Sequence, residues 1–162
     1  MRRFTPVELA VGVALGGALL AAAVPAFLRD LHASRLAEPV DGLNRLGVAA
    51  VAYAEENQRF PEAAPLTPAV PPRGKKEVDP PGTWDAPTWK ALAFRPVPEG
   101  VPHAFAFSFD SAPPKLGTEF VAQARGDLDG DGVMSLFEVR GAVRPGDKAQ
   151  VTPGMYVEAE LE

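Results

Sequence analysis

The chain has 162 residues, of which 46% are apolar and 23% charged, and its formal net charge is −5. The length is that of one domain, and the acidic balance argues against a general nucleic-acid binder, which would carry a basic stripe. There are no cysteines, which excludes disulfides, cysteine zinc sites and thiol catalysis. The apolar residues are unevenly distributed, because residues 9–28 include no formal charge.

Residues 9–28 predict an apolar helix. Twenty helical residues reach about 30 Å, roughly the hydrocarbon thickness of a bilayer. The basic segment 1–3 precedes this stretch, whereas the opposite charges of Arg29 and Asp30 after it nearly cancel. This excess of basic residues in front of the apolar stretch places the N-terminus on the cytoplasmic side and the rest of the chain across the membrane. A cleaved signal peptide is the alternative, with the alanines at 21–23 at its cleavage site, but the apolar stretch is long for one.

The residues in front of this helix have the pattern of a helix start. Thr5 fits the N-cap, Pro6 the first helical position and Glu8 the third position, so that Thr5 and Glu8 form a capping box. In this interpretation the carboxylate of Glu8 only satisfies the helix N-terminus and its dipole.

The same residue order resembles the N-terminus of type IV pilins and type II secretion pseudopilins. That family has a Gly-Phe-Thr-Leu-Ile-Glu-like start, an apolar helix and a proline at its far end. Four residues lie at the matching offsets: Phe4, Glu8, Gly17 and Pro25. The resemblance implies that a prepilin peptidase makes Phe4 the methylated mature N-terminus, and that Glu8 pairs with the terminal amine of a neighbouring subunit. The peptidase of the family cuts after glycine, whereas here Arg3 precedes Phe4.

The physics of filament assembly agrees with this resemblance. Gly12, Gly16 and Gly17 present a smooth surface on which helices can approach closely. A buried carboxylate that gains an ammonium partner fixes axial register, although its desolvation is costly. Pro25 removes one backbone donor and predicts a kink in the segment 4–28.

The next segment, 29–58, changes to an amphipathic pattern. Apolar residues recur at helical spacing: Leu36, Val40, Leu43, Leu46, Ala50 and Tyr53. Pro39 interrupts the segment and predicts a second kink or a short break. We therefore expect one long helix from about Thr5 to Asn57, whose second half packs on a sheet.

The segment 59–102 is rich in proline. Residues 61–102 hold eleven of the 18 prolines, which excludes regular helix and central strand and predicts a loop that is either ordered against the domain or partly mobile. Within it, Asp85 as a cap and Pro87 in the first turn predict one short helix. We expect Trp84 and Trp89 to cover the core.

The last segment, 103–162, predicts an antiparallel meander of four strands at 103–110, 118–125, 136–143 and 155–161, with a turn at 111–117. Phe105, Phe107 and Phe109 share one face of the first strand and would lie on the helix. The expected fold class is α+β, with a long N-terminal helix packed on a four-stranded sheet, which is also the layout that the pilin resemblance implies.

A calcium-loop motif lies between the second and third predicted strands. Six residues fall at the ligand positions of the twelve-residue loop: Asp127, Asp129, Asp131, Val133, Ser135 and Glu138. Calcium needs six to eight hard oxygens, and acidic groups this close repel one another without a cation. Because the flanks predict strands instead of helices, Glu138 can point along its strand and miss the metal. The alternative is a hairpin turn that binds no ion.

The sequence contains no phosphate-binding glycine loop, no Gly-x-Ser-x-Gly elbow and no His-Glu-x-x-His motif, and only His32 and His103 are present. We therefore expect a structural subunit and not an enzyme.

The expected partners are copies of itself or related pilin subunits, the inner membrane before assembly and a prepilin peptidase. The expected location is the inner membrane with an extracytoplasmic C-terminal domain, and a surface filament or periplasmic pseudopilus after assembly. The alternative is an uncleaved single-pass membrane protein with a calcium-dependent binding domain.

Overall fold

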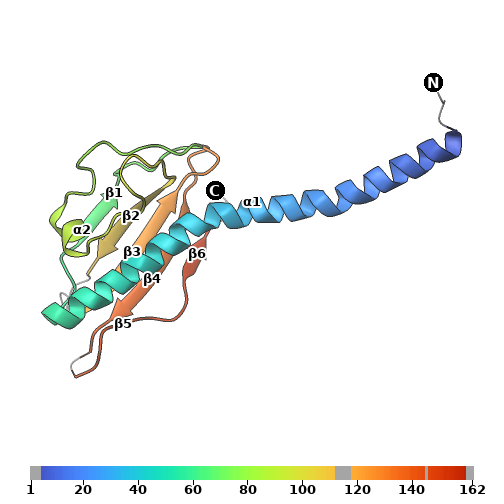
Figure 1. Ribbon diagram of the computed structural model, residues 1–162. Coiled ribbons are helices and arrows are strands. Elements are labelled where there is room, and N and C mark those ends of the chain that lie inside the picture. The colour runs from blue at the N-terminus through green and yellow to red at the C-terminus, as the bar shows by residue number, and fades with distance from the viewer. Residues whose placement is uncertain (1–4, 112–117, 145, 160–162) are drawn as a thin grey trace. The chain divides into compact units, whose positions relative to one another are not determined.

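The computed structural model describes residues 5–111, 118–144 and 146–159, with the backbone alone for 28–33. The predicted basic segment 1–3, the mature N-terminus at Phe4, most of the turn at 111–117 and the end of the last predicted strand lie outside these residues. The chain divides into two compact units, Met1–Arg35 and Leu36–Glu162. Figure 1 shows the elements in chain order: α1 (Pro6–Asn57), β1 (Ala64–Thr67), α2 (Pro87–Ala91), β2 (Phe105–Asp110), β3 (Glu119–Gly126), β4 (Ser135–Ala142), β5 (Gln150–Val151) and β6 (Tyr156–Glu158).

The helix α1 begins with the predicted capping box. The backbone N–H of Thr5 donates to Oε2 of Glu8 at 2.7 Å, and the N–H of Glu8 donates to Oγ1 of Thr5 at 3.2 Å. The helix is continuous over 52 residues, so neither Pro25 nor Pro39 ends it. The short break that was the alternative at Pro39 is therefore absent, and a kink at either proline stays a prediction.

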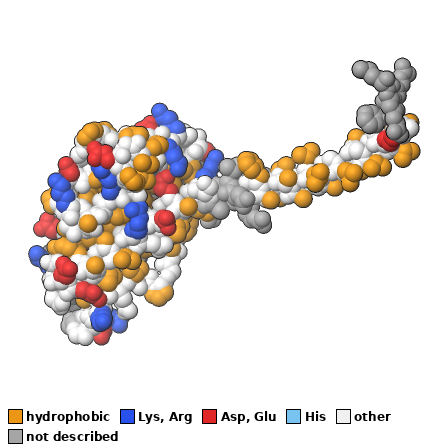
Figure 2. Space-filling view, viewed as in Figure 1, with side chains coloured by type: hydrophobic (Ala, Val, Ile, Leu, Met, Phe, Trp, Pro, Cys, Tyr) orange, Lys and Arg blue, Asp and Glu red, His pale blue; other side chains and the backbone are white. Residues whose placement is uncertain are grey.

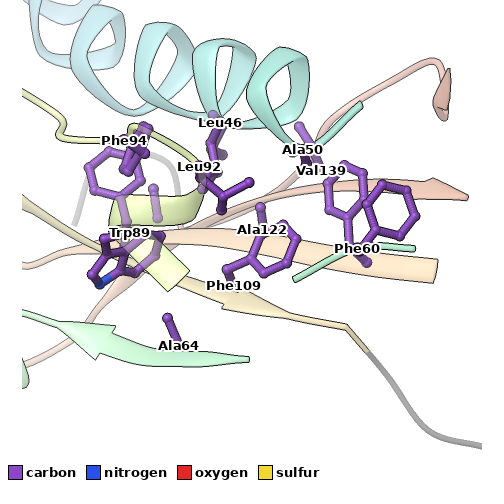
Figure 3. Packing of buried hydrophobic residues seen from close by; sticks show 14 of the residues in the cluster. Leu46, Ala50, Phe60, Ala64, Trp89, Leu92, Phe94, Phe109, Ala122 and Val139 are labelled. Atoms are coloured by element: carbon purple, nitrogen blue, oxygen red, sulfur yellow. The ribbon is translucent and has the colours of Figure 1, made fainter. Parts of the chain in front are cut away.

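The predicted apolar stripe of α1 packs in the second unit. Leu43, Leu46 and Ala50 have no exposed surface, and Figure 3 shows Leu46 and Ala50 pointing from the helix toward the sheet. Gly42 is needed at this interface, because a Cβ there would lie 2.5 Å from the ring of Phe107. The stripe was predictable because it depends only on helical spacing.

The sheet has six strands among the described residues, not the four predicted. Strands β1, β2, β3 and β4 are antiparallel neighbours in that order, and β5 and β6 both pair with β4. The predicted strands correspond to β2, β3, β4 and β6. The prediction missed β1 because Pro65 lies within it and Pro68 directly follows it, and proline is tolerated in a sheet only at an edge. It missed β5 because a strand of two residues is too short to show the alternation of apolar and polar side chains that identifies a strand.

The loop between β1 and β2 covers the core with aromatic side chains, as predicted. Trp84 is 5% and Trp89 1% exposed; Trp89 lies on α2, and Figure 3 shows it against Phe94. The short helix begins with Pro87 in its first turn, as expected, but its N-cap is Ala86. The prediction that Asp85 caps it was wrong, because this carboxylate lies 3.5 Å from Nζ of Lys90 instead.

Candidate functional site

The acidic loop connects β3 to β4, and the predicted strand–loop–strand setting is confirmed. Strand β3 ends at Gly126 and β4 begins at Ser135. Gly130 and Gly132 have φ values of +86° and +96°, a conformation that residues with a Cβ adopt rarely. These two glycines allow the chain to reverse within the loop and turn its side chains inward.

Three carboxylates converge inside this loop. One ligand oxygen from each of Asp127, Asp129 and Asp131 lies within 4.8 Å of the others. Asp127 is 1% exposed, and its two oxygens accept the backbone N–H groups of Gly130 at 2.7 Å and Gly132 at 3.2 Å.

The other two carboxylates are exposed and are also oriented by the backbone. Oδ1 of Asp129 accepts the N–H of Asp131 at 3.1 Å, and Oδ1 of Asp131 accepts the N–H of Val133 at 2.7 Å. These hydrogen bonds fix the acidic side chains in place before any cation binds. A cluster of hard carboxylate oxygens is the chemistry that Ca²⁺ takes in proteins.

The remaining predicted ligands have other partners. The hydroxyl of Ser135 is buried and donates to the carbonyl of Gly126 at 3.0 Å. The carboxylate of Glu138 lies on β4, where it accepts Nε2 of Gln123 at 2.7 Å and Nε of Arg140 at 2.6 Å. Val133 is exposed, and its backbone N–H donates to the carboxylate of Asp131. The structure thus brings the three aspartates together and places Glu138 outside their cluster.

The pKa of Glu138 reflects this separate environment. Partial burial opposes its ionisation, but the hydrogen bond from Gln123 and the pairing with Arg140 outweigh burial. Together they hold the pKa of Glu138 below its ordinary value. Glu138 is therefore a carboxylate that is stabilised by the sheet itself.

Sequence reasoning missed the segment that packs on the acidic loop. The N–H of Gly74 donates to the carbonyl of Asp127 at 2.8 Å, and Nε of Arg73 lies 3.9 Å from Oδ2 of Asp127. A Cβ on Gly74 would lie 3.2 Å from the carbonyl oxygen of Asp129. The pairing joins positions more than fifty apart in the chain, and only the basic character of the segment at 73–76 indicates it in the sequence.

The second candidate site is the N-terminal part of α1. Among the described residues, one helical segment, Pro6–Phe27, is long and apolar enough to cross a membrane, and none of it is buried. Figure 2 shows hydrophobic side chains (orange) along this segment, with an acidic side chain (red) near its start. A Cβ added at Gly12, Gly16 or Gly17 would meet no atom within 4 Å. This surface is free to contact lipid or another helix.

These observations define an α+β protein with an N-terminal apolar helix of membrane-spanning length and an antiparallel sheet. No family model, no curated protein and no solved structure matches the chain.

Proposed function

We propose that the chain is a structural filament subunit, a minor pilin or pseudopilin of a type IV pilus or type II secretion filament, whose sheet domain has a structural calcium site. The observation that carries the proposal is the exposed apolar segment Pro6–Phe27, which begins at a capping box containing Glu8. It belongs to the same helix as the stripe that packs on the sheet.

The exposure of this segment supports a subunit that occupies two apolar environments in turn. Nine large apolar side chains between Val7 and Phe27 are each half exposed or more. A patch of this extent is unfavourable in water. The bilayer covers it before assembly, and helices of neighbouring subunits cover it in the filament. The glycines at 12, 16 and 17 permit the close helix approach that such packing needs.

Glu8 has one role in each environment under this proposal. In the isolated chain it caps its own helix through Thr5. In the filament it pairs with the terminal amine of a neighbouring subunit and so sets the axial register. The candidate amine is that of Phe4, as the family resemblance implies, once a prepilin peptidase has removed 1–3.

The calcium ion has a structural role in this proposal. Asp127, Asp129 and Asp131 supply the carboxylates, and the ion relieves their mutual repulsion. Because Asp127 also accepts the N–H of Gly74 through its carbonyl, an ordered acidic loop supports the proline-rich loop as well. The sheet domain lies on the extracytoplasmic side, where calcium is plentiful.

One sequence feature favours a second function. Arg3 stands where the family has glycine, which favours an uncleaved single-pass membrane protein with a calcium-dependent binding domain. Mass spectrometry of the N-terminus of protein from its native host separates the two. The filament proposal predicts a methylated Phe4 in the sheared filament fraction. An intact Met1, with all of the protein in the membrane fraction, would overturn it in favour of the second function.

A further inference from the structure

One cation of the proline-rich loop lies beside the acidic loop. Arg73, Lys75 and Lys76 are close together in the sequence, and all three side chains are largely exposed. Nε of Arg73 lies 3.9 Å from Oδ2 of Asp127, whose side chain has no exposed surface. Arg73 therefore offers a positive charge to the buried member of the three aspartates that we propose as calcium ligands.

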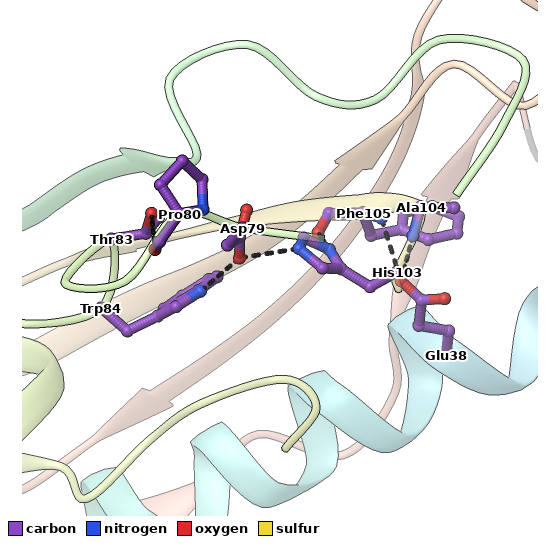
Figure 4. A network of polar contacts seen from close by, with 8 residues as sticks. All are labelled: Glu38, Asp79, Pro80, Thr83, Trp84, His103, Ala104 and Phe105. Carbon is purple, nitrogen blue, oxygen red and sulfur yellow. Dashed lines mark hydrogen bonds and ion pairs between the residues drawn. The ribbon is translucent and has the colours of Figure 1, made fainter. Parts of the chain in front are cut away.

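The two lysines are paired with other carboxylates. Nζ of Lys75 lies 3.1 Å from Oε1 of Glu77, and Nζ of Lys76 lies 3.5 Å from Oε2 of Glu38. Figure 4 shows Glu38 on α1, where its other oxygen, Oε1, accepts two backbone N–H groups at 2.8 and 2.9 Å. Among the described residues, Arg73 is thus the one cation within ion-pairing distance of an aspartate of the acidic loop.

The backbone that carries this arginine is held at both ends. On one side, the N–H of Gly74 donates to the carbonyl of Asp127 at 2.8 Å. On the other side, the backbones of Glu77 and His103 exchange N–H···O bonds of 2.9 and 3.0 Å. His103 is buried, and its Nε2 lies 2.7 Å from Oδ2 of Asp79 (Figure 4). The arginine therefore stays next to the acidic loop.

The charges of this arrangement match those of a divalent ion. The three aspartates carry three negative charges, and Arg73 offsets one of them. The two that remain equal the charge of Ca²⁺. The number of charged ligands and the rigidity of a calcium loop tune its affinity for the ion. A fixed cation beside the ligands repels the ion and so lowers this affinity.

We propose that Arg73 regulates the acidic loop as a built-in counter-charge, which weakens calcium binding and raises the calcium concentration at which the site fills. This inference rests on the calcium site proposed above and not on the filament role. Without calcium, Arg73 offsets part of the charge of the aspartates. Because the effect is electrostatic, it increases with the charge of the bound ion and declines with ionic strength.

Calorimetric titration of the full chain in detergent with calcium measures the effect. Arg73→Gln removes the charge, so at low ionic strength calcium should bind roughly three- to tenfold more tightly than to the wild type. Arg73→Ala, a second neutral variant, should show the same gain. Lys75→Gln is the matched control, because it removes a positive charge from the same segment at a residue that pairs with Glu77. It should change the dissociation constant by less than about twofold.

Three further measurements distinguish charge from structure. Arg73→Lys keeps the charge, and a gain in this variant equal to that of Arg73→Gln would overturn the proposal. The factor gained by Arg73→Gln should be larger for trivalent terbium than for calcium, and it should shrink in about 0.5 M salt. If Arg73 only held the loop in shape, Arg73→Gln would instead bind both ions more weakly, which would also overturn the proposal.

Failure of this inference and failure of the calcium site give different results. If the wild type binds calcium and Arg73→Gln binds it equally or more weakly, the counter-charge is wrong and the calcium site stands. If neither protein binds calcium, the calcium site is wrong and the inference fails with it. Melting curves in chelator confirm that each variant is folded, as expected for a side chain that is 62% exposed.

Discussion

Thr5 and Glu8 cap the first turn of α1 reciprocally, each accepting the backbone N–H of the other. The structural role and the proposed assembly role of Glu8 therefore reside in one carboxylate, and variants can separate them. Glutamine at the third helical position can still complete a capping box, but it has no charge to offer an ammonium group.

We therefore expect Glu8→Gln to leave membrane insertion intact and to abolish recovery of the chain in sheared filaments. Thr5→Ala is the matched control, because it removes one capping hydrogen bond, worth about 1 kcal/mol, and keeps the charge. It should still enter filaments. Immunoblots of the membrane and filament fractions measure both. Normal incorporation of Glu8→Gln would mean that the residue is only a cap.

Two glycines of α1 should respond oppositely to substitution. Gly42→Ala places a Cβ 2.5 Å from the buried ring of Phe107 and should destabilise the sheet domain by about 1–3 kcal/mol. Gly16→Leu meets no atom within 4 Å of its new Cβ, so thermal unfolding in detergent should not change. It should reduce incorporation into filaments, because a larger side chain prevents close helix approach. Full incorporation of Gly16→Leu would contradict the proposed packing.

Calcium should raise the melting temperature of the wild-type chain. A ligand present at one hundred times its dissociation constant adds about 2.7 kcal/mol to the free energy of unfolding. Asp129→Asn and Asp131→Asn retain the oxygens that accept backbone N–H groups, so their unfolding in chelator should match that of the wild type. In calcium both variants should melt lower. Equal melting temperatures of the variants and the wild type, both in calcium and in chelator, would contradict the proposed calcium site.

Asp127 is a poorer choice for that test. It accepts two N–H groups with its carboxylate and is buried. Its replacement by alanine should therefore destabilise the loop even in chelator, by about 1–3 kcal/mol for the unsatisfied donors. Scanning calorimetry with and without calcium distinguishes this structural cost from the loss of a ligand.

The lowered pKa of Glu138 predicts a pH-dependent stability. Its contribution is fully present above the ordinary glutamate pKa of about 4.3 and is lost as the pH falls through the lower pKa of the folded state. Glu138→Gln should cost about 1 kcal/mol near neutral pH, since its partner Arg140 is largely exposed. Denaturant unfolding curves should converge with the wild type in acid. Glu119→Gln, at an exposed position of β3, is the control, and a constant difference across pH would contradict the assignment.

The parts of the fold that depend on local pattern could be predicted from the sequence. The capping box of Thr5 and Glu8 and the stripe around Leu46 follow from spacing within one helix. Asp85 was misassigned as a cap because its neighbour Ala86 occupies the N-cap. The strand β1 was missed because Pro65 within it and Pro68 after it argue against a strand, although proline is tolerated at a sheet edge.

The candidate site was predictable only where the loop itself sets the geometry. The calcium-loop template assumes a helix after the loop, whereas a strand rises about 3.3 Å per residue. Glu138 therefore lies about 10 Å along β4 from Ser135, and its partners come from the sheet. The contact of Gly74 with Asp127 and the pair of His103 with Asp79 join distant segments, for which one sequence offers no periodic signal.

Cross-linking along the apolar segment tests the filament proposal most directly. The chain has no cysteine, so single cysteines can be scanned across Pro6–Phe27 and joined by a short bifunctional reagent in sheared filaments and in membranes. If the chain is a filament subunit, we expect covalent species containing this chain in the filament fraction, at positions that repeat every three to four residues along one helix face. Monomers at every position, with the chain confined to the membrane fraction, would contradict it.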